Sequence, residues 1–463
     1  MGVWREDKTF LSAIDPGPIY PLTGRFRVKG DLGMQRLFGR RTAGACLAVL
    51  AVGLLVSGCD WYELGGSSAH NGDNAFDTTI TPANVSTLSA HFSATDGTTG
   101  SLTPTAVVNG VLYASSDAGL EAYSANGTNG CSGSPVTCAP SWSYATGPVS
   151  GNAAVLNGVV YASTSSGLEA FDAAGQTNCS ATPRVCQSLW SAPGSFGDPT
   201  VSNGTVYVTS SAGIEAFDAA GQIDCAGSPK VCVPIWSGGE GYGTVTVSAG
   251  VAFVFGGPGA VAFDANGSTG CSGTPKVCSP LWSYHTNYSP ADYTYPIVVG
   301  TTLFVGTGGI VFHASFDGDL EAFDAGGIGG CSNSLCQPLW ADHYAFPGDP
   351  LVAGDGAVFQ PGPFSPTITF EAFAAGGSGA ALWSSSELAT PLVIGGSVLY
   401  AQGENGDIQA YDAGGSAGCS GSPMTCAPLW STPGTNAIEA NGTVYVSTTG
   451  ASGKGEIVAY GLP

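Results

Sequence analysis

The stretch Gly167–Trp190, with the sequence GLEAFDAAGQTNCSATPRVCQSLW, recurs along most of the chain. Residues 213–236 read GIEAFDAAGQIDCAGSPKVCVPIW, and residues 259–282 read GAVAFDANGSTGCSGTPKVCSPLW. Shorter or altered copies lie at 119–142, 319–340, 370–383, 407–430 and 456–460. Repeats of this size are typical of architectures in which one unit cannot bury its own apolar face and packs it against its neighbours.

Counting the aromatic residue that follows the Ala of each copy gives eight units. These aromatics are Tyr123, Phe171, Phe217, Phe263, Phe323, Phe373, Tyr411 and Tyr460, separated by 38 to 60 residues. In the first unit, β-rich segments at 103–110, 111–115, 120–123 and 140–144 are separated by Gly-containing turns or loops, and the later units repeat this order. Val, Tyr, Phe and Trp enrichment between such turns predicts strands. Four strands per unit, eight times, predict an all-β fold: an eight-bladed β-propeller of four-stranded antiparallel blades.

The two ends of the repeat array predict how the ring closes. The last unit stops after its third strand, at 456–460, and therefore lacks a fourth. A lone strand at 88–94 precedes the first unit and carries Phe92 in the register of the Trp. We expect this N-terminal strand to complete the last blade, which removes the open sheet edge of the array.

The recurring Ala-aromatic-Asp, Gly and Trp pattern resembles the tryptophan-docking repeat of the PQQ-like (quinoprotein dehydrogenase-like) β-propellers. The resemblance covers residues 88–463 and implies that Ala and Trp lock neighbouring blades together. It assigns blade docking to Trp142, Trp190, Trp236, Trp282, Trp340, Trp383 and Trp430. An Asp at the position of Asp172 and a Glu at the position of Glu169 recur from unit to unit. We therefore interpret them as turn and inter-blade hydrogen-bonding residues.

Twelve of the fourteen cysteines form close pairs in the sequence. The pairs are Cys131/Cys138, Cys179/Cys186, Cys225/Cys232, Cys271/Cys278, Cys331/Cys336 and Cys419/Cys426. Zinc is the competing interpretation, but no CxxC spacing occurs and no His lies beside the pairs. Six local disulfides are therefore predicted, on loops opposite the usual ligand face, and they place the chain in an oxidising compartment.

The N-terminal region reads as a targeting segment. We interpret residues 1–33 as an over-extended start and residues 34–58 as a signal peptide, in which arginines precede the apolar run 43–56 that contains Cys46. Val56-Ser57-Gly58-Cys59 resembles the bacterial lipobox, which implies that Cys59 becomes the diacylated first residue of the mature protein. Residues 59–87 are then expected to be a lipidated tether, and residues 88–463 the propeller.

Charge restricts the partners. From Cys59 onward the chain has 30 Asp and Glu against four Lys and Arg, a net charge of −26. Such a surface repels phosphate backbones, so we expect no nucleic acid partner. A monomer anchored to a membrane on the extracytoplasmic side, with an unknown protein or glycan partner in the cell envelope, fits this composition.

No reaction can be read from the sequence. Quinoprotein dehydrogenases of the resembled family use adjacent cysteines over the cofactor, a calcium site and an Asp base, and some add a Cys-x-x-Cys-His haem site. This chain has neither adjacent cysteines nor Cys-x-x-Cys-His. We therefore expect no cofactor and no catalytic residues, although PQQ or calcium stays open. Asp317-Gly-Asp319 and Glu404-Asn-Gly-Asp407 resemble fragments of calcium loops, and we interpret them as turns.

Departures from the repeat indicate a possible ligand patch. Aromatic, acidic and histidine residues gather in the connections around the fifth unit: His285, Tyr288, Asp292, Tyr293, His313, His343 and Tyr344. Such loops serve binding or only packing. The expected function is a non-catalytic binding or scaffolding module, similar at fold level to the propeller lipoprotein of the outer-membrane barrel assembly machinery. The alternatives are a degenerate quinoprotein oxidoreductase and a carbohydrate-binding propeller.

Overall fold

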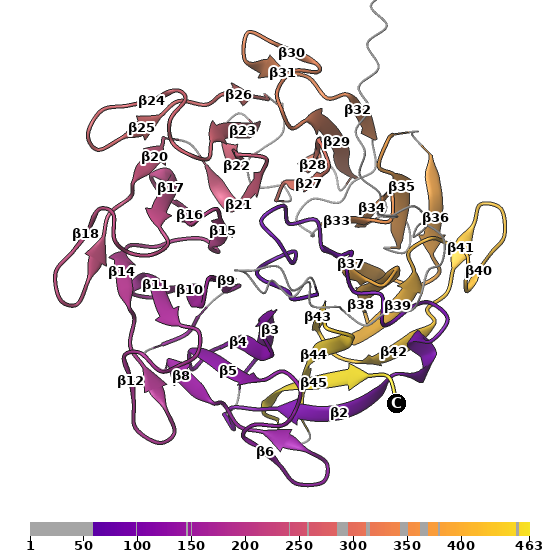
Figure 1. Ribbon diagram of the computed structural model, residues 1–463. Coiled ribbons are helices and arrows are strands. Elements are labelled where there is room, and N and C mark those ends of the chain that lie inside the picture. Colours follow the sequence, from indigo (N-terminus) through magenta and orange to yellow (C-terminus); the bar gives the residue numbers. More distant parts are fainter. Residues whose placement is uncertain are drawn as a thin grey trace, which may run out of the picture. The chain divides into compact units, whose positions relative to one another are not determined.

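The protein is an all-β propeller of eight blades arranged around a central axis (Figure 1). This computed structural model describes residues 59–98, 100–144, 147–149, 151–239, 241–256, 259–284, 295–311, 315–342, 351–361, 369–377, 380–450 and 453–463. All of them belong to one compact unit, Ala43–Pro463. Within these residues the helical element is a single 3₁₀ turn, η1 (Val85–Thr87). The predicted fold class is confirmed.

Each blade has four antiparallel strands that follow one another from the axis outward, as the repeat predicted. Blades 1 to 4 comprise β3 (Leu102–Val108), β4 (Val111–Ser116), β5 (Leu120–Ser124) and β8 (Trp142–Tyr144); β9 (Ala154–Leu156), β10 (Val159–Thr164), β11 (Gly167–Asp172) and β14 (Trp190–Pro193); β15 (Thr200–Ser202), β16 (Thr205–Ser210), β17 (Gly213–Asp218) and β20 (Trp236–Gly238); and β21 (Tyr242–Ser248), β22 (Val251–Gly256), β23 (Gly259–Asp264) and β26 (Trp282–Ser283).

The second half of the ring repeats this order. Blades 5 to 8 comprise β27 (Ile297–Val299), β28 (Thr302–Val311), β29 (Ser315–Asp324) and β32 (Trp340–Asp342); β33 (Val352–Gly354), β34 (Ala357–Pro361), β35 (Phe370–Ala374) and β36 (Ala381–Ser385); β37 (Ala389–Gly395), β38 (Val398–Gly403), β39 (Asp407–Asp412) and β42 (Trp430–Pro433); and β43 (Asn436–Ala440), β44 (Thr443–Thr449), β45 (Gly455–Gly461) and β2 (Ser89–Ala94).

The ring closes through the N-terminal strand, as predicted. Strand β2 pairs antiparallel with β45, and Phe92 lies opposite Ala459. In the other blades the Trp of the fourth strand occupies this position, for example Trp190 opposite Ala170. The last blade therefore contains both ends of the propeller, and neither end leaves an open edge between its third and fourth strands.

The Trp of one blade packs on a glycine of the next blade. A Cβ atom added to Gly175 would lie 2.2 Å from Cδ1 of Trp142, and Gly175 has a φ of +61°, so only glycine fits this turn. Trp142 also donates a hydrogen bond from Nε1 to the carbonyl oxygen of Ala173 at 3.2 Å. Tyr113, on the second strand, donates to the same carbonyl at 3.1 Å. Blades 1 and 2 are thus joined by ring packing and by two buried hydrogen bonds to one oxygen.

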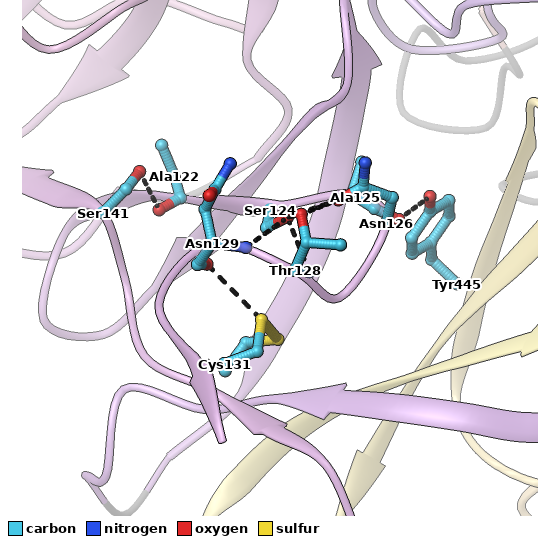
Figure 2. Close-up of a disulfide and its surroundings, with 10 residues drawn as sticks. Ala122, Ser124, Ala125, Asn126, Thr128, Asn129, Cys131, Ser141 and Tyr445 are labelled. Atoms are coloured by element: carbon cyan, nitrogen blue, oxygen red, sulfur yellow. Dashed lines mark hydrogen bonds between the residues drawn. A yellow bond between two sulfur atoms is a disulfide. The ribbon is translucent and has the colours of Figure 1, made fainter.

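Polar turns hold this glycine in place. In blade 2, Asp172 Oδ2 accepts the backbone N–H groups of Gln176 and Thr177 at 2.8 and 2.6 Å. These bonds hold the pKa of Asp172 below its usual range, although partial burial acts in the opposite direction. In blade 1 Ser124 takes the place of the Asp and its hydroxyl accepts the N–H of Thr128 (Figure 2).

The six predicted disulfides are present in the structure. Figure 2 shows the one that contains Cys131. Each closes a two-stranded hairpin: β6 (Cys131–Ser132) with β7 (Thr137–Cys138), β12 (Cys179–Ser180) with β13 (Val185–Cys186), β18 (Cys225–Ala226) with β19 (Val231–Cys232), β24 (Cys271–Ser272) with β25 (Val277–Cys278), β30 (Cys331–Ser332) with β31 (Leu335–Cys336), and β40 (Cys419–Ser420) with β41 (Thr425–Cys426).

The position of these hairpins differs from the expectation. The hairpins were expected on the face opposite the usual ligand face. Each hairpin instead pairs in parallel with the fourth strand of the preceding blade, as Val185 of β13 does with Ser143 of β8. Most blade sheets therefore have six strands, and the hairpins project from the rim (Figure 1). Blade 5 keeps four strands, because the third-to-fourth connection of the next unit contains no cysteines.

Removal of the closing aromatic should destabilise the ring. Phe92 is buried, and its ring lies against Gly127 of blade 1. We expect Phe92→Ala to lower the free energy of unfolding by about 3 kcal/mol or more, as for other buried Phe truncations. Phe76, which is 76% exposed, provides the control: Phe76→Ala should change stability by less than about 0.5 kcal/mol. Equal urea midpoints for the two variants would contradict closure through β2.

Candidate functional site

The seven residues of the predicted ligand patch lie outside the described residues. They are His285, Tyr288, Asp292, Tyr293, His313, His343 and Tyr344. On the described edge of this region, Tyr284 donates a hydrogen bond to Glu321 at 2.8 Å and packs on Phe323 with ring centroids 4.7 Å apart. Tyr284 therefore belongs to the packing between blades. The patch itself stays a prediction.

The segment that was expected to be a tether lies instead at the centre of the ring. Residues 59–77, the channel segment, cross the axis and form hydrogen bonds with the innermost part of all eight blades (Figure 1). Trp61 and Val107 of blade 1 exchange two backbone bonds at 2.8 and 2.7 Å. In each of the other seven blades one backbone N–H group donates a hydrogen bond to the channel segment. The donors and acceptors are Val155 to Tyr62 O, Val201 to Glu63 Oε2, Val247 to Ser68 O, Val298 to Ala69 O, Ala353 to Asn71 O, Ile394 to Gly72 O and Asn441 to Cys59 O.

This arrangement satisfies the inner edges of the blades. The first strand of a blade has no neighbour on the axial side, and its edge N–H groups need acceptors once they are buried. The channel segment supplies one to each blade, and near its end β1 (Asp73–Asn74) pairs in parallel with β37. Residues 59–77, which lie in the expected lipidated tether 59–87, are therefore bound to the blades in this structure. The adjacent aromatics Trp61 and Tyr62 were the sequence signal against a free linker, since such linkers are poor in aromatic residues.

The channel segment carries buried ionisable groups. His70 lies between the hydroxyls of Thr200 and Thr246, with its two ring nitrogens 3.2 Å from them. Burial lowers the pKa of His70 to about 3, so the imidazole is neutral. Glu63 is 1% exposed, and burial raises its pKa to about 8 although the Val201 N–H bond lowers it. Burial and the neighbouring Asp355 raise the pKa of Asp73 to about 7.

A cavity of about 300 Å³ opens beside this segment. Its walls are the inner strands and first turns of blades 1 to 3 on one side, and the turn that follows Trp61 on the other. The lining residues are Tyr62, Glu63, Ser67, Ser68, Val108, Asn109, Val155, Leu156, Asn157, Gly158 and Val201. Apolar walls with a few converging polar groups are the usual composition of a small-molecule site.

The shape of the cavity depends on a tight turn. Tyr62 donates its N–H to Gly66 O at 3.1 Å, and Gly66 donates to Glu63 O at 2.8 Å. Gly66 has a φ of +80°, and a Cβ added there would lie 2.9 Å from the ring of Trp61. The turn therefore requires glycine, and it directs Glu63 toward Val201 of blade 3.

A second hollow, of about 380 Å³, lies at blades 8, 1 and 2 on the opposite face of the propeller. Its described lining is polar, including Ser101, Ser115, Asp117, Asn152 and Asn436, and contains no aromatic side chain. Hydroxyls and amides without an aromatic platform do not favour a sugar site. The first cavity is therefore the stronger candidate.

The described residues do not fit a PQQ and calcium site of the kind that the resembled dehydrogenases use. The channel segment fills the axis, and every cysteine between residues 131 and 426 is paired in a local hairpin. In the described part of the chain no three His, Cys, Asp or Glu side chains are grouped to hold a metal ion. Asp317 and Asp319 lie within the β28–β29 ladder, and Gly406 forms a turn next to Asp407.

Comparisons with known proteins agree on the fold. No family model and no curated protein sequence matches the chain. Among solved structures, a quinohemoprotein alcohol dehydrogenase from Pseudomonas putida matches at 14% identity and a TM-score of 0.56, over 88% of this chain and 80% of its own. BamB from Moraxella catarrhalis matches at 16% identity and a TM-score of 0.52, over 81% of this chain and 99% of its own. The chain therefore has a PQQ-like β-propeller fold.

Among the described residues, no helix is long and apolar enough to cross a bilayer.

Glu63 should make stability depend on pH. Its pKa of about 8 in the folded protein exceeds its usual value of 4.5, so the folded state holds a proton that the unfolded state loses in this window. Stability from this group is therefore present below about pH 4.5 and is lost as the pH rises toward 8. Glu63→Gln keeps an acceptor for Val201 and does not titrate. We expect the variant to gain about 3–4 kcal/mol relative to wild type between about pH 5 and pH 8 in urea unfolding.

Glu404→Gln, at an exposed position, serves as the control for this series. A Glu63→Gln difference that is flat across the range would contradict the assignment of a buried, protonated Glu63.

Proposed function

We propose that the protein is a non-catalytic binding or scaffolding propeller of the bacterial cell envelope, anchored to a membrane through lipid on Cys59. The observation that carries this proposal is the filled axis: the chain's own residues 59–77 take the central channel, which leaves the faces and the rim for partners. The six disulfides support an oxidising, extracytoplasmic compartment. The likeness to BamB and to the quinohemoprotein alcohol dehydrogenase supports the propeller scaffold of this proposal.

The lipid anchor places the propeller directly on the membrane. The Cys59 carbonyl accepts hydrogen bonds from Asn441 N–H at 3.1 Å and Asn74 Nδ2 at 3.0 Å, so the first residue of the mature protein is fixed to blade 8. Cys59 Sγ lies 3.5 Å from the carbonyl oxygen of the exposed Phe76. Cleavage before Cys59 removes Cys46 with the signal peptide and leaves Cys59 as the residue that is acylated.

Loss of the anchor should release the protein. In cells that express the full chain, Cys59→Ser should move the propeller from the membrane to the soluble fraction and abolish incorporation of an alkyne-tagged fatty acid. The double variant Cys179→Ser/Cys186→Ser removes one rim disulfide and should stay lipidated and membrane-bound. Membrane association of Cys59→Ser equal to wild type would contradict a lipid anchor at this residue.

The rim supplies an apolar surface for a protein partner. The hairpins of the third to fifth units expose aliphatic side chains that face solvent, and the equivalent hairpin of the second unit is polar. The exposed residues are Ile223, Val231, Val233, Val277, Ile328, Leu335 and Leu339. Aliphatic residues gathered on neighbouring projections, with no core of their own to fill, mark a protein contact surface. We therefore assign partner binding to these hairpins.

A matched pair of variants tests the rim. Ile223→Asp/Val233→Asp alters the apolar hairpin, and Thr177→Asp/Gln187→Asp places the same charges at the equivalent positions of the polar hairpin. After crosslinking in cells, we expect the first variant to lose partner bands that wild type and the second variant retain, at unchanged melting temperature. Retention of every band by both variants would show that this rim does not bind the partner.

A further inference from the structure

Glu63 presents a buried carboxyl group, and no cation among the described residues pairs with it. Its one hydrogen-bond donor among the described residues is the N–H of Val201, at 2.7 Å from Oε2. A buried carboxylate is costly unless a positive group pairs with it, and otherwise it stays protonated. The raised pKa of Glu63 agrees with a protonated carboxyl group in the ligand-free protein. The carboxyl therefore has unused capacity to bind a cation.

The part of the chain that the structure describes does not supply this cation. From Cys59 onward its Lys and Arg residues are Arg184, Lys230, Lys276 and Lys454, and none of them lines the cavity. Arg184 donates to Gly175 O and Lys230 to Gly221 O, both beside the rim hairpins. Since no described residue provides a positive group at Glu63, a ligand is the source that we consider.

The walls of the cavity define the rest of the ligand. Val108, Val155, Leu156 and Val201 form apolar walls on blades 1 to 3, and the chain segment opposite contributes the Tyr62 side chain. An alkyl chain gains free energy from such walls, at about 0.8 kcal/mol for each buried CH₂ group. Ser67, Ser68, Asn109 and Asn157 add hydroxyl and amide groups to the lining. A volume of about 300 Å³ is ample for a short alkyl chain with one charged end.

The charges around the cavity also favour a positively charged ligand. Tyr62 and Glu63 are the titratable side chains among the cavity's lining residues, and blades 1 to 3 contribute none. Burial, together with Asp60, raises the pKa of Tyr62 to about 12, so the phenol is neutral. Asp60 accepts hydrogen bonds from Asn109 N–H and Asn441 Nδ2. With a net charge of −26 beyond residue 58, the field of the protein attracts cations and repels phosphates and carboxylates.

We propose that this cavity binds a primary alkylammonium group, with Glu63 as its counter-ion and the aliphatic residues of blades 1 to 3 as walls for the alkyl chain. Either a free alkylamine or the lysine side chain of a protein partner provides this chemistry. The inference does not depend on the lipid anchor or on the rim surface, so its failure would leave the proposed function standing.

Binding involves one proton. In the free protein the Glu63 carboxyl is protonated below about pH 8, and the alkylammonium ion carries its own charge up to about pH 10. Formation of the ion pair releases the Glu63 proton to the buffer, and no other bond changes. Affinity should therefore rise about tenfold per pH unit from about pH 6 to pH 8 and then level off.

Isothermal titration calorimetry of the full propeller with n-butylamine tests this directly. We expect binding that strengthens about tenfold per pH unit below pH 8 and releases about one proton at pH 6, read from buffers of different ionisation enthalpy. Butan-1-ol, which has the same alkyl chain without the charge, should bind at least about tenfold more weakly at pH 8. Nα-acetyl-lysine N-methylamide forms the second arm. If it binds and n-butylamine does not, the source is a protein lysine, and the reverse result identifies a free amine.

Two variants complete the experiment. Glu63→Gln should lose at least about tenfold in n-butylamine affinity and all proton release, whereas Glu404→Gln should match wild type. The wild-type proton release keeps the test valid should Glu63→Gln fold poorly, which circular dichroism would show. Equal affinity for n-butylamine and butan-1-ol, binding without proton release, undiminished binding to Glu63→Gln, or no binding of either amine at millimolar concentration would overturn the assignment.

Discussion

The propeller depends on the packing of the fourth-strand aromatic side chain of one blade against a glycine of the next, which recurs at most junctions. At three successive junctions a Tyr and the Trp also donate hydrogen bonds to a single carbonyl oxygen. Ala219 O accepts Tyr161 OH at 2.9 Å and Trp190 Nε1 at 3.1 Å, and Ala265 O accepts Tyr207 OH at 3.0 Å and Trp236 Nε1 at 3.2 Å. Each such buried hydrogen bond contributes about 1 kcal/mol net, and losing one partner costs more because a polar atom stays buried. The contact therefore fixes the angle between blades as well as their separation.

The remaining elements can be understood as covers for the edges that this contact leaves open. A blade has an inner edge at the axis and an outer edge at the rim, and unpaired edges cost free energy or invite aggregation. The channel segment covers the inner edges, the disulfide hairpins cover most outer edges, and β2 completes the last sheet. Tyr445 of blade 8 donates to Ala125 O of blade 1 at 2.7 Å, so the inter-blade contact continues across the closure (Figure 2).

Most of this structure could be predicted from the sequence because its pattern repeats. Blade number, strand order, closure through Phe92 and the six disulfides were predictable, because each rests on a local pattern that recurs or on one visible gap in it. The Tyr of the second strand was also visible, at Tyr113, Tyr161 and Tyr207, but its role as a second donor needed three-dimensional distances. The hairpin pairing was missed because a two-residue strand carries no signal for the neighbour it joins.

The channel segment was missed for a different physical reason. Its acceptors are mostly backbone carbonyls, which every residue type provides, so its sequence does not reveal the eight partners. Among the eight contacts that satisfy the inner edges, Glu63 is the one made by a side chain: it accepts the N–H of Val201 in blade 3, and the turn at Gly66 brings the carboxyl there.

The side-chain contact of Glu63 with Val201 has a consequence for function. Every backbone contact of the channel segment is neutral, whereas this one places a titratable group in the wall of the cavity beside blades 1 to 3. A backbone carbonyl could satisfy Val201 without the cost of burying an acid. The cationic ligand that we propose accounts for an acid at this position.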